Sequence, residues 1–164
     1  MQKLRYGLVL AALLALTGAP TARAAQSTAR CAAVTPDRIA ALFEQWNRAL
    51  KTLDPDKVTD TYAADAVLLP TVENGPLIGR KAIRGYFVGF LKKHPEGTIE
   101  SRSIRIGCNI AFDAGLYSFT LDGPEPGRRA TLAARYTYIY EIEGGRWLIV
   151  HHHSSALPQP GAAH

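Results

Sequence analysis

Three consecutive histidines, His151 to His153, are the residues of this chain best suited to acid–base chemistry. Imidazole changes its charge near neutral pH, so it can serve as a general base, a proton donor or a metal ligand. The run lies in a segment that is typical of a strand, where alternation places His151 and His153 on one face and His152 on the other. For catalysis, the sequence offers His153 as the candidate general base and Tyr138 or Tyr62 as the candidate proton donor.

A two-residue turn at Gly144-Gly145 would set the register of the final hairpin. Tyr138 then pairs with His151, and aromatic and histidine side chains form one wall, as in many small-molecule pockets. The predicted ligand-binding residues are Tyr62, Arg135, Tyr138, His151 and His153. A three-residue turn at residues 143–145 would instead bring Arg135 to this face and remove Tyr138. The same composition also suits a packed core or an interface, so both alternatives stay open.

Metal and cofactor chemistry find little support in the sequence. The pair His151 and His153 supplies two ligands, whereas zinc takes at least three from a protein. We find no phosphate-binding glycine loop, dinucleotide fingerprint or nucleophile motif, and we therefore expect no metal and no cofactor. Asp65 and Glu73 are the carboxylates that could act as an acid, but both lie in turn-like contexts where a solvated carboxylate is the ordinary case.

The first 24 residues have the pattern of a secretory signal peptide. Lys3 and Arg5 precede an apolar run at residues 7–18, and Ala22-Arg23-Ala24 is typical of a cleavage site. The run is shorter than the roughly 20 residues of a membrane-spanning helix, which disfavours a retained anchor. We expect cleavage between Ala24 and Ala25 and a periplasmic or secreted protein with no later membrane association.

Cleavage changes the interpretation of the charge. The net charge of +5 includes Lys3, Arg5 and Arg23, so three positive charges leave with the signal and the mature chain carries +2. No cluster of basic residues or nucleic-acid-binding motif remains, and we expect no nucleic-acid partner.

The chain has two cysteines, Cys31 and Cys108. In an oxidising compartment an even number favours a Cys31–Cys108 disulfide over two separate buried thiols.

The elements that must position these residues change in type along the chain. A helix should begin at Thr35-Pro36 and bury an apolar face at helical spacing, and a short second helix should begin at Asp54-Pro55 and carry Tyr62. After a short strand at residues 66–69 and a third helix at residues 80–92, the period changes to two. Segregated helices and strands predict an α+β domain: three N-terminal helices packed in a curved antiparallel sheet, a cone with a pocket at its open end. We expect a lead-in at residues 25–34, a domain at residues 35–158 and a mobile tail at residues 159–164.

Two segments resemble a known family. Residues 145–158 (GRWLIVHHHSSALP) and residues 79–87 (GRKAIRGYF) are similar to parts of the association domain of calcium/calmodulin-dependent protein kinase II. This resemblance implies the cone of the nuclear-transport-factor-2-like superfamily, which ketosteroid isomerase and SnoaL-like proteins share. Bacterial stand-alone members are often labelled SgcJ/EcaC-type. The resembling region contains no kinase domain, so kinase activity and calmodulin binding do not carry over.

The resemblance also implies self-association, and we expect at least a homodimer. The family lines its pocket with basic residues, but here the corresponding positions hold Tyr138, Ser154 and Ile83. The strand face opposite the aromatic wall is apolar and needs cover from a partner or from helices. It consists of Thr137, Ile139, Leu148 and Val150. Two functions follow: a self-associating pocketed module that binds a small molecule, or a small cofactor-free isomerase or hydrolase acting on an apolar substrate.

Overall fold

The structure is a computed structural model, and it describes residues 30–158. The chain runs α1 (Pro36–Lys51), α2 (Pro55–Thr59), β1 (Tyr62–Leu69), β2 (Leu77–Ile78) and α3 (Gly79–Phe90), followed by a 3₁₀ turn at Leu91–Lys93. Four long strands follow: β3 (Glu96–Ile106), β4 (Ile110–Asp122), β5 (Arg129–Glu143) and β6 (Arg146–Ala156). The predicted α+β class is confirmed. The signal peptide with its Ala24–Ala25 cleavage site, most of the lead-in and the tail lie outside the described residues.

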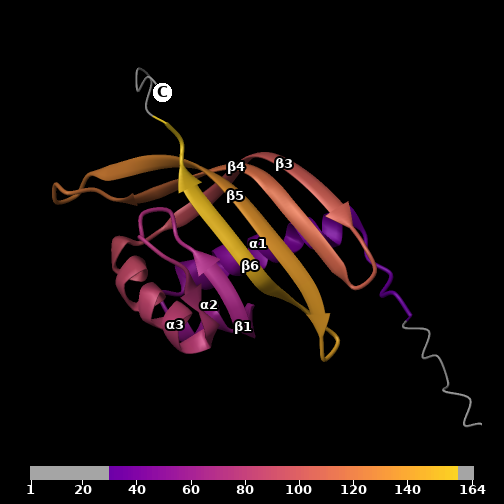
Figure 1. Cartoon of the computed structure of the whole chain (residues 1–164). Coiled ribbons are helices and arrows are strands. Elements are labelled where there is room, and N and C mark those ends of the chain that lie inside the picture. The colour runs from indigo at the N-terminus through magenta and orange to yellow at the C-terminus, as the bar shows by residue number, and fades with distance from the viewer. Residues whose placement is uncertain (1–29, 159–164) are drawn as a thin grey trace, which may run out of the picture.

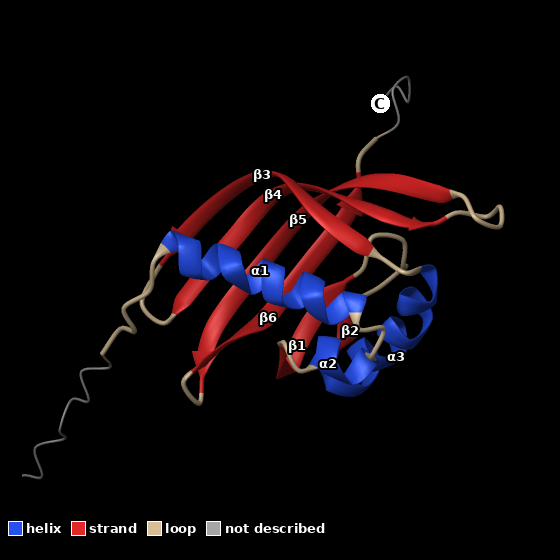
Figure 2. Ribbon diagram, turned by 180° about the vertical axis from the view of Figure 1, so that it is seen from behind, coloured by secondary structure: helices blue, strands red, loops and turns tan. Residues whose placement is uncertain are grey.

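The long helix α1 begins where the sequence predicts. Thr35 caps it by accepting a hydrogen bond from the Arg38 backbone N–H, and Pro36 occupies the first turn. Its apolar face is buried against the sheet, which it crosses obliquely (Figure 2). The buried positions are Ile39, Leu42, Phe43, Trp46, Asn47 and Leu50. Because these side chains fill one face of the sheet, α1 defines the inner face of the cone.

The six strands form one sheet in the order β2-β1-β6-β5-β4-β3. The four long strands are antiparallel neighbours, as predicted, and β1 pairs with β6 in parallel. Figure 1 looks onto the outer face of this sheet, and no helix of the described chain runs across it. Within residues 30–158, no helix is both long and apolar enough to cross a membrane.

The second helix is shorter than predicted. It ends at Thr59, so Tyr62 begins strand β1 instead of extending a helix, and it pairs with Ile149 of β6. The prediction rested on two apolar residues four apart, a spacing too short to separate a helix from a turn that enters a strand. The two-residue strand β2 was not predicted, and α3, predicted at residues 80–92, spans Gly79–Phe90.

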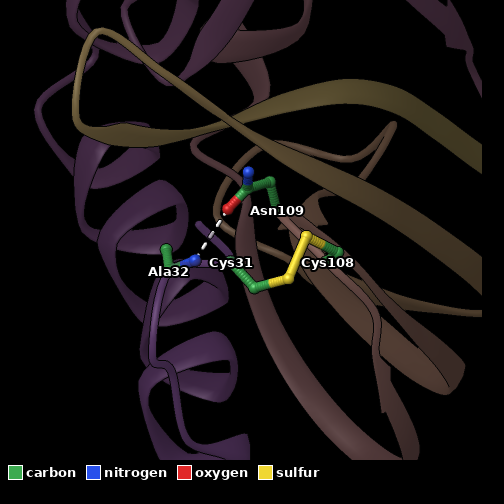
Figure 3. The surroundings of a disulfide bond; sticks show 4 residues. All are labelled: Cys31, Ala32, Cys108 and Asn109. Atoms are coloured by element: carbon green, nitrogen blue, oxygen red, sulfur yellow. Dashed lines mark hydrogen bonds between the residues drawn. A yellow bond between two sulfur atoms is a disulfide. The ribbon is translucent and has the colours of Figure 1, made fainter. Parts of the chain in front are cut away.

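The predicted disulfide joins Cys31 to Cys108, with a Cα–Cα distance of 4.7 Å (Figure 3). It links the segment before α1 to the turn between β3 and β4. In the same turn, the side chain of Asn109 accepts a 2.7 Å hydrogen bond from the Ala32 backbone N–H. The two contacts hold the N-terminal segment against the sheet, and a formed disulfide fits a protein that folds in an oxidising compartment.

Candidate functional site

A β-bulge in the last hairpin decides which histidine faces the interior. The turn has two residues as predicted, Gly144 and Gly145, both with positive φ, and Tyr140 pairs with Ile149. Val150 is then an extra residue on β6, because the next pair is Ile139 with His151. A bulge of this kind moves all later side chains to the opposite face. Tyr138 therefore pairs with His152, and the predicted pairing of Tyr138 with His151 is wrong.

The five predicted ligand-binding residues consequently divide between the two faces. Tyr62 and Tyr138 are fully buried on the inner face. Arg135, His151 and His153 alternate with inner-face residues, so they lie on the outer face, where Arg135 and His153 are exposed. The proposed acid–base pair of His153 with Tyr138 is not brought together. His152, which the sequence interpretation assigned only to the other face, is the histidine beside both tyrosines.

His152 lies at the centre of a hydrogen-bonded group. Its Nδ1 is 2.9 Å from the Tyr62 hydroxyl, which accepts a 3.1 Å hydrogen bond from the Trp46 indole N–H. Its Nε2 is 3.5 Å from the Tyr117 hydroxyl, and the Tyr138 ring stacks on the imidazole at 4.1 Å. Desolvation lowers the pKa of His152 to about 3, with smaller contributions from His151 and His153. The imidazole is therefore neutral at physiological pH.

A small cavity adjoins this group. It measures about 20 Å³, which is room for about one water molecule. Its lining combines aromatic side chains with a few polar groups. These polar groups include His152, Ser154 and Thr71, and the Ser154 and Thr71 hydroxyls are hydrogen-bonded to each other.

A larger groove of about 460 Å³ lies next to the cavity. Four side chains line both spaces and thus form the partition between them: Thr71, Tyr86, Phe90 and Phe119. The rings of Tyr86 and Phe90 stack at 5.4 Å. Leu121, Leu132 and Val72 make the rest of the groove apolar, and the charged residues along it are Glu73 and Lys93. The groove is thus a largely apolar space, and the partition separates it from the His152 and Ser154 side chains of the small cavity.

Two glycines of α3, Gly85 and Gly89, also line the groove. A glycine inside a helix costs roughly 1 kcal/mol relative to alanine. A Cβ atom at either position would meet no heavy atom within 4 Å, so packing does not require glycine there. The two residues therefore keep the groove open at a cost to the helix.

A second polar cluster lies on the other side of Tyr138. Asp113 is fully buried, and one of its oxygens accepts hydrogen bonds from the Tyr136 hydroxyl at 2.8 Å and from Arg102 Nε at 3.2 Å. Desolvation raises the pKa of this carboxyl, although Tyr136 and Arg102 oppose the shift. Four buried atoms of the cluster have no hydrogen-bond partner among the described residues: Arg102 Nη2, Asp113 Oδ2, Tyr138 Oη and Tyr140 Oη.

The outer face carries apolar side chains in register across the central strands. Phe112 pairs with Ile139, which pairs in turn with His151, and Leu116 pairs with Arg135. Phe112 and Leu116 are 41% and 38% exposed. The predicted outer residues Thr137, Ile139, Leu148 and Val150 are half-buried.

Comparison with solved structures identifies the class of fold. The chain resembles a Salmonella enterica protein of the nuclear transport factor 2 superfamily, at 17% identity and a TM-score of 0.65 over 77% of this chain and 93% of the other. It also resembles a Caulobacter vibrioides protein with a cystatin-like fold, at 22% identity and a TM-score of 0.63 over 77% and 91%. The predicted nuclear-transport-factor-2-like cone is thereby confirmed, and at these identities the likeness shows the fold alone.

Two further matches are specific. A Xanthomonas campestris protein assigned to the calcium/calmodulin dependent protein kinase II association domain is 47% identical, with a TM-score of 0.73 over 79% of this chain and 96% of the other. The sequence profile of the calcium/calmodulin dependent protein kinase II association domain matches residues 36–158. No curated protein matches the chain. The chain belongs to the calcium/calmodulin dependent protein kinase II association domain family.

Proposed function

We propose that this protein is an exported, self-associating module that binds a small apolar molecule in the groove at the open end of the cone. The observation that carries the ligand site is the 460 Å³ groove, kept open by two helix glycines that packing does not require. Its lining matches the common composition of ligand sites, which combine apolar walls with a few polar groups.

Binding is favoured over acid–base catalysis. A histidine with a pKa of about 3 is a weak base at neutral pH, because efficient general bases titrate near the working pH. Burial also raises the pKa of the Tyr62 hydroxyl well above its ordinary value, which makes it a poor proton donor. The inner group is better suited to orienting a ligand than to transferring protons.

The groove can be tested by filling it. Gly89→Leu should place a side chain in the groove, because a Cβ atom at this position meets no heavy atom within 4 Å. We expect the apolar dye N-phenyl-1-naphthylamine to fluoresce saturably with the wild-type chain and at least tenfold more weakly with Gly89→Leu. Val88→Leu is the matched control, since Val88 is an exposed neighbour on α3 that does not line the groove. Equal dye binding by all three proteins would contradict the groove as the ligand site.

Self-association is proposed through the outer face of the sheet. Family membership supports an assembling domain, and the exposed side chains of Phe112 and Leu116, with Ile139 opposite Phe112, supply the apolar surface. On this proposal His151, His153 and Arg135 lie at the contact between copies instead of in a pocket.

Light scattering at micromolar concentration should show a homodimer for the wild-type chain and a monomer for Phe112→Glu. A buried unpaired carboxylate at the interface would cost several kcal/mol. Gln45→Glu adds the same charge on an exposed position of α1 and should leave the dimer intact. A wild-type monomer would contradict the proposal.

A further inference from the structure

The hydrogen bonds around His152 assign its tautomer. The Trp46 indole can only donate, and it donates to the Tyr62 hydroxyl oxygen. The Tyr62 proton has one acceptor among its contacts in the described chain, His152 Nδ1 at 2.9 Å. The arrangement that satisfies all three groups makes Nδ1 an acceptor. The proton of the neutral imidazole is then on Nε2.

The Nε2–H group has no acceptor at an ordinary hydrogen-bond distance among the described residues. Its nearest partner, the Tyr117 hydroxyl, is 3.5 Å away, at the outer limit of a hydrogen bond. His152 lines the 20 Å³ cavity together with the Ser154 and Thr71 hydroxyls. This space has room for one acceptor atom, while the body of a ligand would occupy the adjoining groove once Tyr86 and Phe90 part.

The polar groups that line the cavity carry no charge. The pKa of His152 is about 3, burial raises the pKa of the Tyr117 hydroxyl, and the remaining lining groups are hydroxyls and apolar side chains. A carboxylate placed there would be desolvated without a counter-charge, at a cost of several kcal/mol. An uncharged carbonyl oxygen would instead satisfy Nε2–H.

We infer that the pocket takes an uncharged, largely apolar molecule bearing a carbonyl-type acceptor, which receives a hydrogen bond from His152 Nε2–H. This inference rests on the proposed ligand groove. It adds a specificity-determining residue, His152, and the chemical class of the ligand.

Three probes of nearly the same shape separate the possibilities: acetophenone, benzoate and α-methylstyrene. Titrations followed by amide ¹H–¹⁵N NMR of the purified chain should show acetophenone binding about tenfold more tightly than either other probe, the effect of one neutral hydrogen bond at the upper end of its usual range. In His152→Phe, acetophenone should bind no more tightly than α-methylstyrene. Gly89→Leu should weaken all three.

The outcomes are distinguishable. Benzoate binding most tightly, or equal binding of acetophenone and α-methylstyrene, would overturn the inference and leave the pocket intact. Failure of every probe to perturb groove resonances at millimolar concentration would overturn the proposed pocket and the inference with it. Independently of any ligand, the imidazole ¹⁵N shifts of His152 should show a protonated Nε2 and an unprotonated Nδ1, and the reverse assignment would overturn the inference even if His152→Phe fails to fold.

Discussion

Two buried polar clusters lie on either side of Tyr138, and they differ in how their polar atoms are satisfied. The histidine cluster consists of Trp46, Tyr62, Tyr117 and His152 and is neutral. The carboxylate cluster consists of Arg102, Asp113, Tyr136 and Tyr140 and contains an ion pair whose carboxylate is fully buried. Strand register places Asp113, Tyr138 and His152 side by side across β4, β5 and β6.

The contrast suits the binding role proposed for the histidine cluster and a structural role for the carboxylate cluster. In the histidine cluster a chain of donors and acceptors ends at a cavity with one weakly held donor. In the carboxylate cluster Asp113 is fully buried and Arg102 is partly exposed, and Arg102, Asp113, Tyr138 and Tyr140 each keep a buried atom without a hydrogen-bond partner among the described residues. The first arrangement has room for a ligand atom, whereas the second ties β3 to β4 through the contact between Arg102 and Asp113.

The largest expected effect comes from breaking the ion pair. Arg102→Met keeps a long apolar stem near Phe43 but leaves the Asp113 carboxylate buried without a counter-charge. We expect a loss of about 3 to 5 kcal/mol in the free energy of unfolding at pH 7. Urea denaturation measures it, with Arg105→Met as a control on an exposed position of the same strand. A loss below 1 kcal/mol would mean that the pair does not hold β3 to β4.

The two clusters should respond to acid with opposite signs. Burial lowers the pKa of His152 from 6.5 to about 3. As the pH falls below 6.5, the imidazole therefore binds a proton in the unfolded chain before it does so in the folded chain. Proton binding to the unfolded chain lowers the free energy of unfolding. At pH 4.5, two pH units below 6.5, His152 lowers the free energy of unfolding by about 3 kcal/mol, at 1.4 kcal/mol per pH unit. Because the pKa of Asp113 is raised, this carboxyl acts in the reverse direction, and its contribution to stability grows as pH falls through its folded pKa.

Unfolding of the wild-type chain and of His152→Phe across pH 7 to 4.5 isolates the histidine contribution. The variant should lose about 1 to 3 kcal/mol at pH 7, because the Tyr62 hydroxyl loses its acceptor. The difference between the two proteins should shrink or reverse towards pH 4.5. Parallel curves would contradict a buried neutral histidine.

The smallest expected effect is that of Tyr138→Phe, and the neighbouring Tyr136 provides the comparison. Tyr136 donates to the Asp113 carboxylate at 2.8 Å, so Tyr136→Phe should cost about 1.5 to 3 kcal/mol. The Tyr138 hydroxyl has no partner among the described residues, so Tyr138→Phe should be neutral or slightly stabilising. Thermal unfolding of the two variants compares them. Equal losses would show that Tyr138 has a hydrogen-bond partner.

Local patterns predicted several elements well. Thr35-Pro36 marks the start of α1, and the spacing of its apolar residues identified the buried face, because capping and helical periodicity are short-range properties. The Gly144-Gly145 turn was also predicted, because tight hairpin turns favour glycine. Both residues have positive φ in the structure. For α2 the same reasoning failed at Tyr62, where pairing with β6 takes over from helical periodicity.

The sequence by itself determined the α+β class, the disulfide partners and the family, because each depends on residue types and their order. The tertiary structure alone decided which histidine is internal. One extra residue at Val150 turns His152 inward and leaves His151 and His153 on the outer face. A bulge is defined by how one strand pairs with its neighbour, so the sequence of a single strand does not reveal it. A shift of one residue then moves every later side chain of that strand to the opposite face of the sheet.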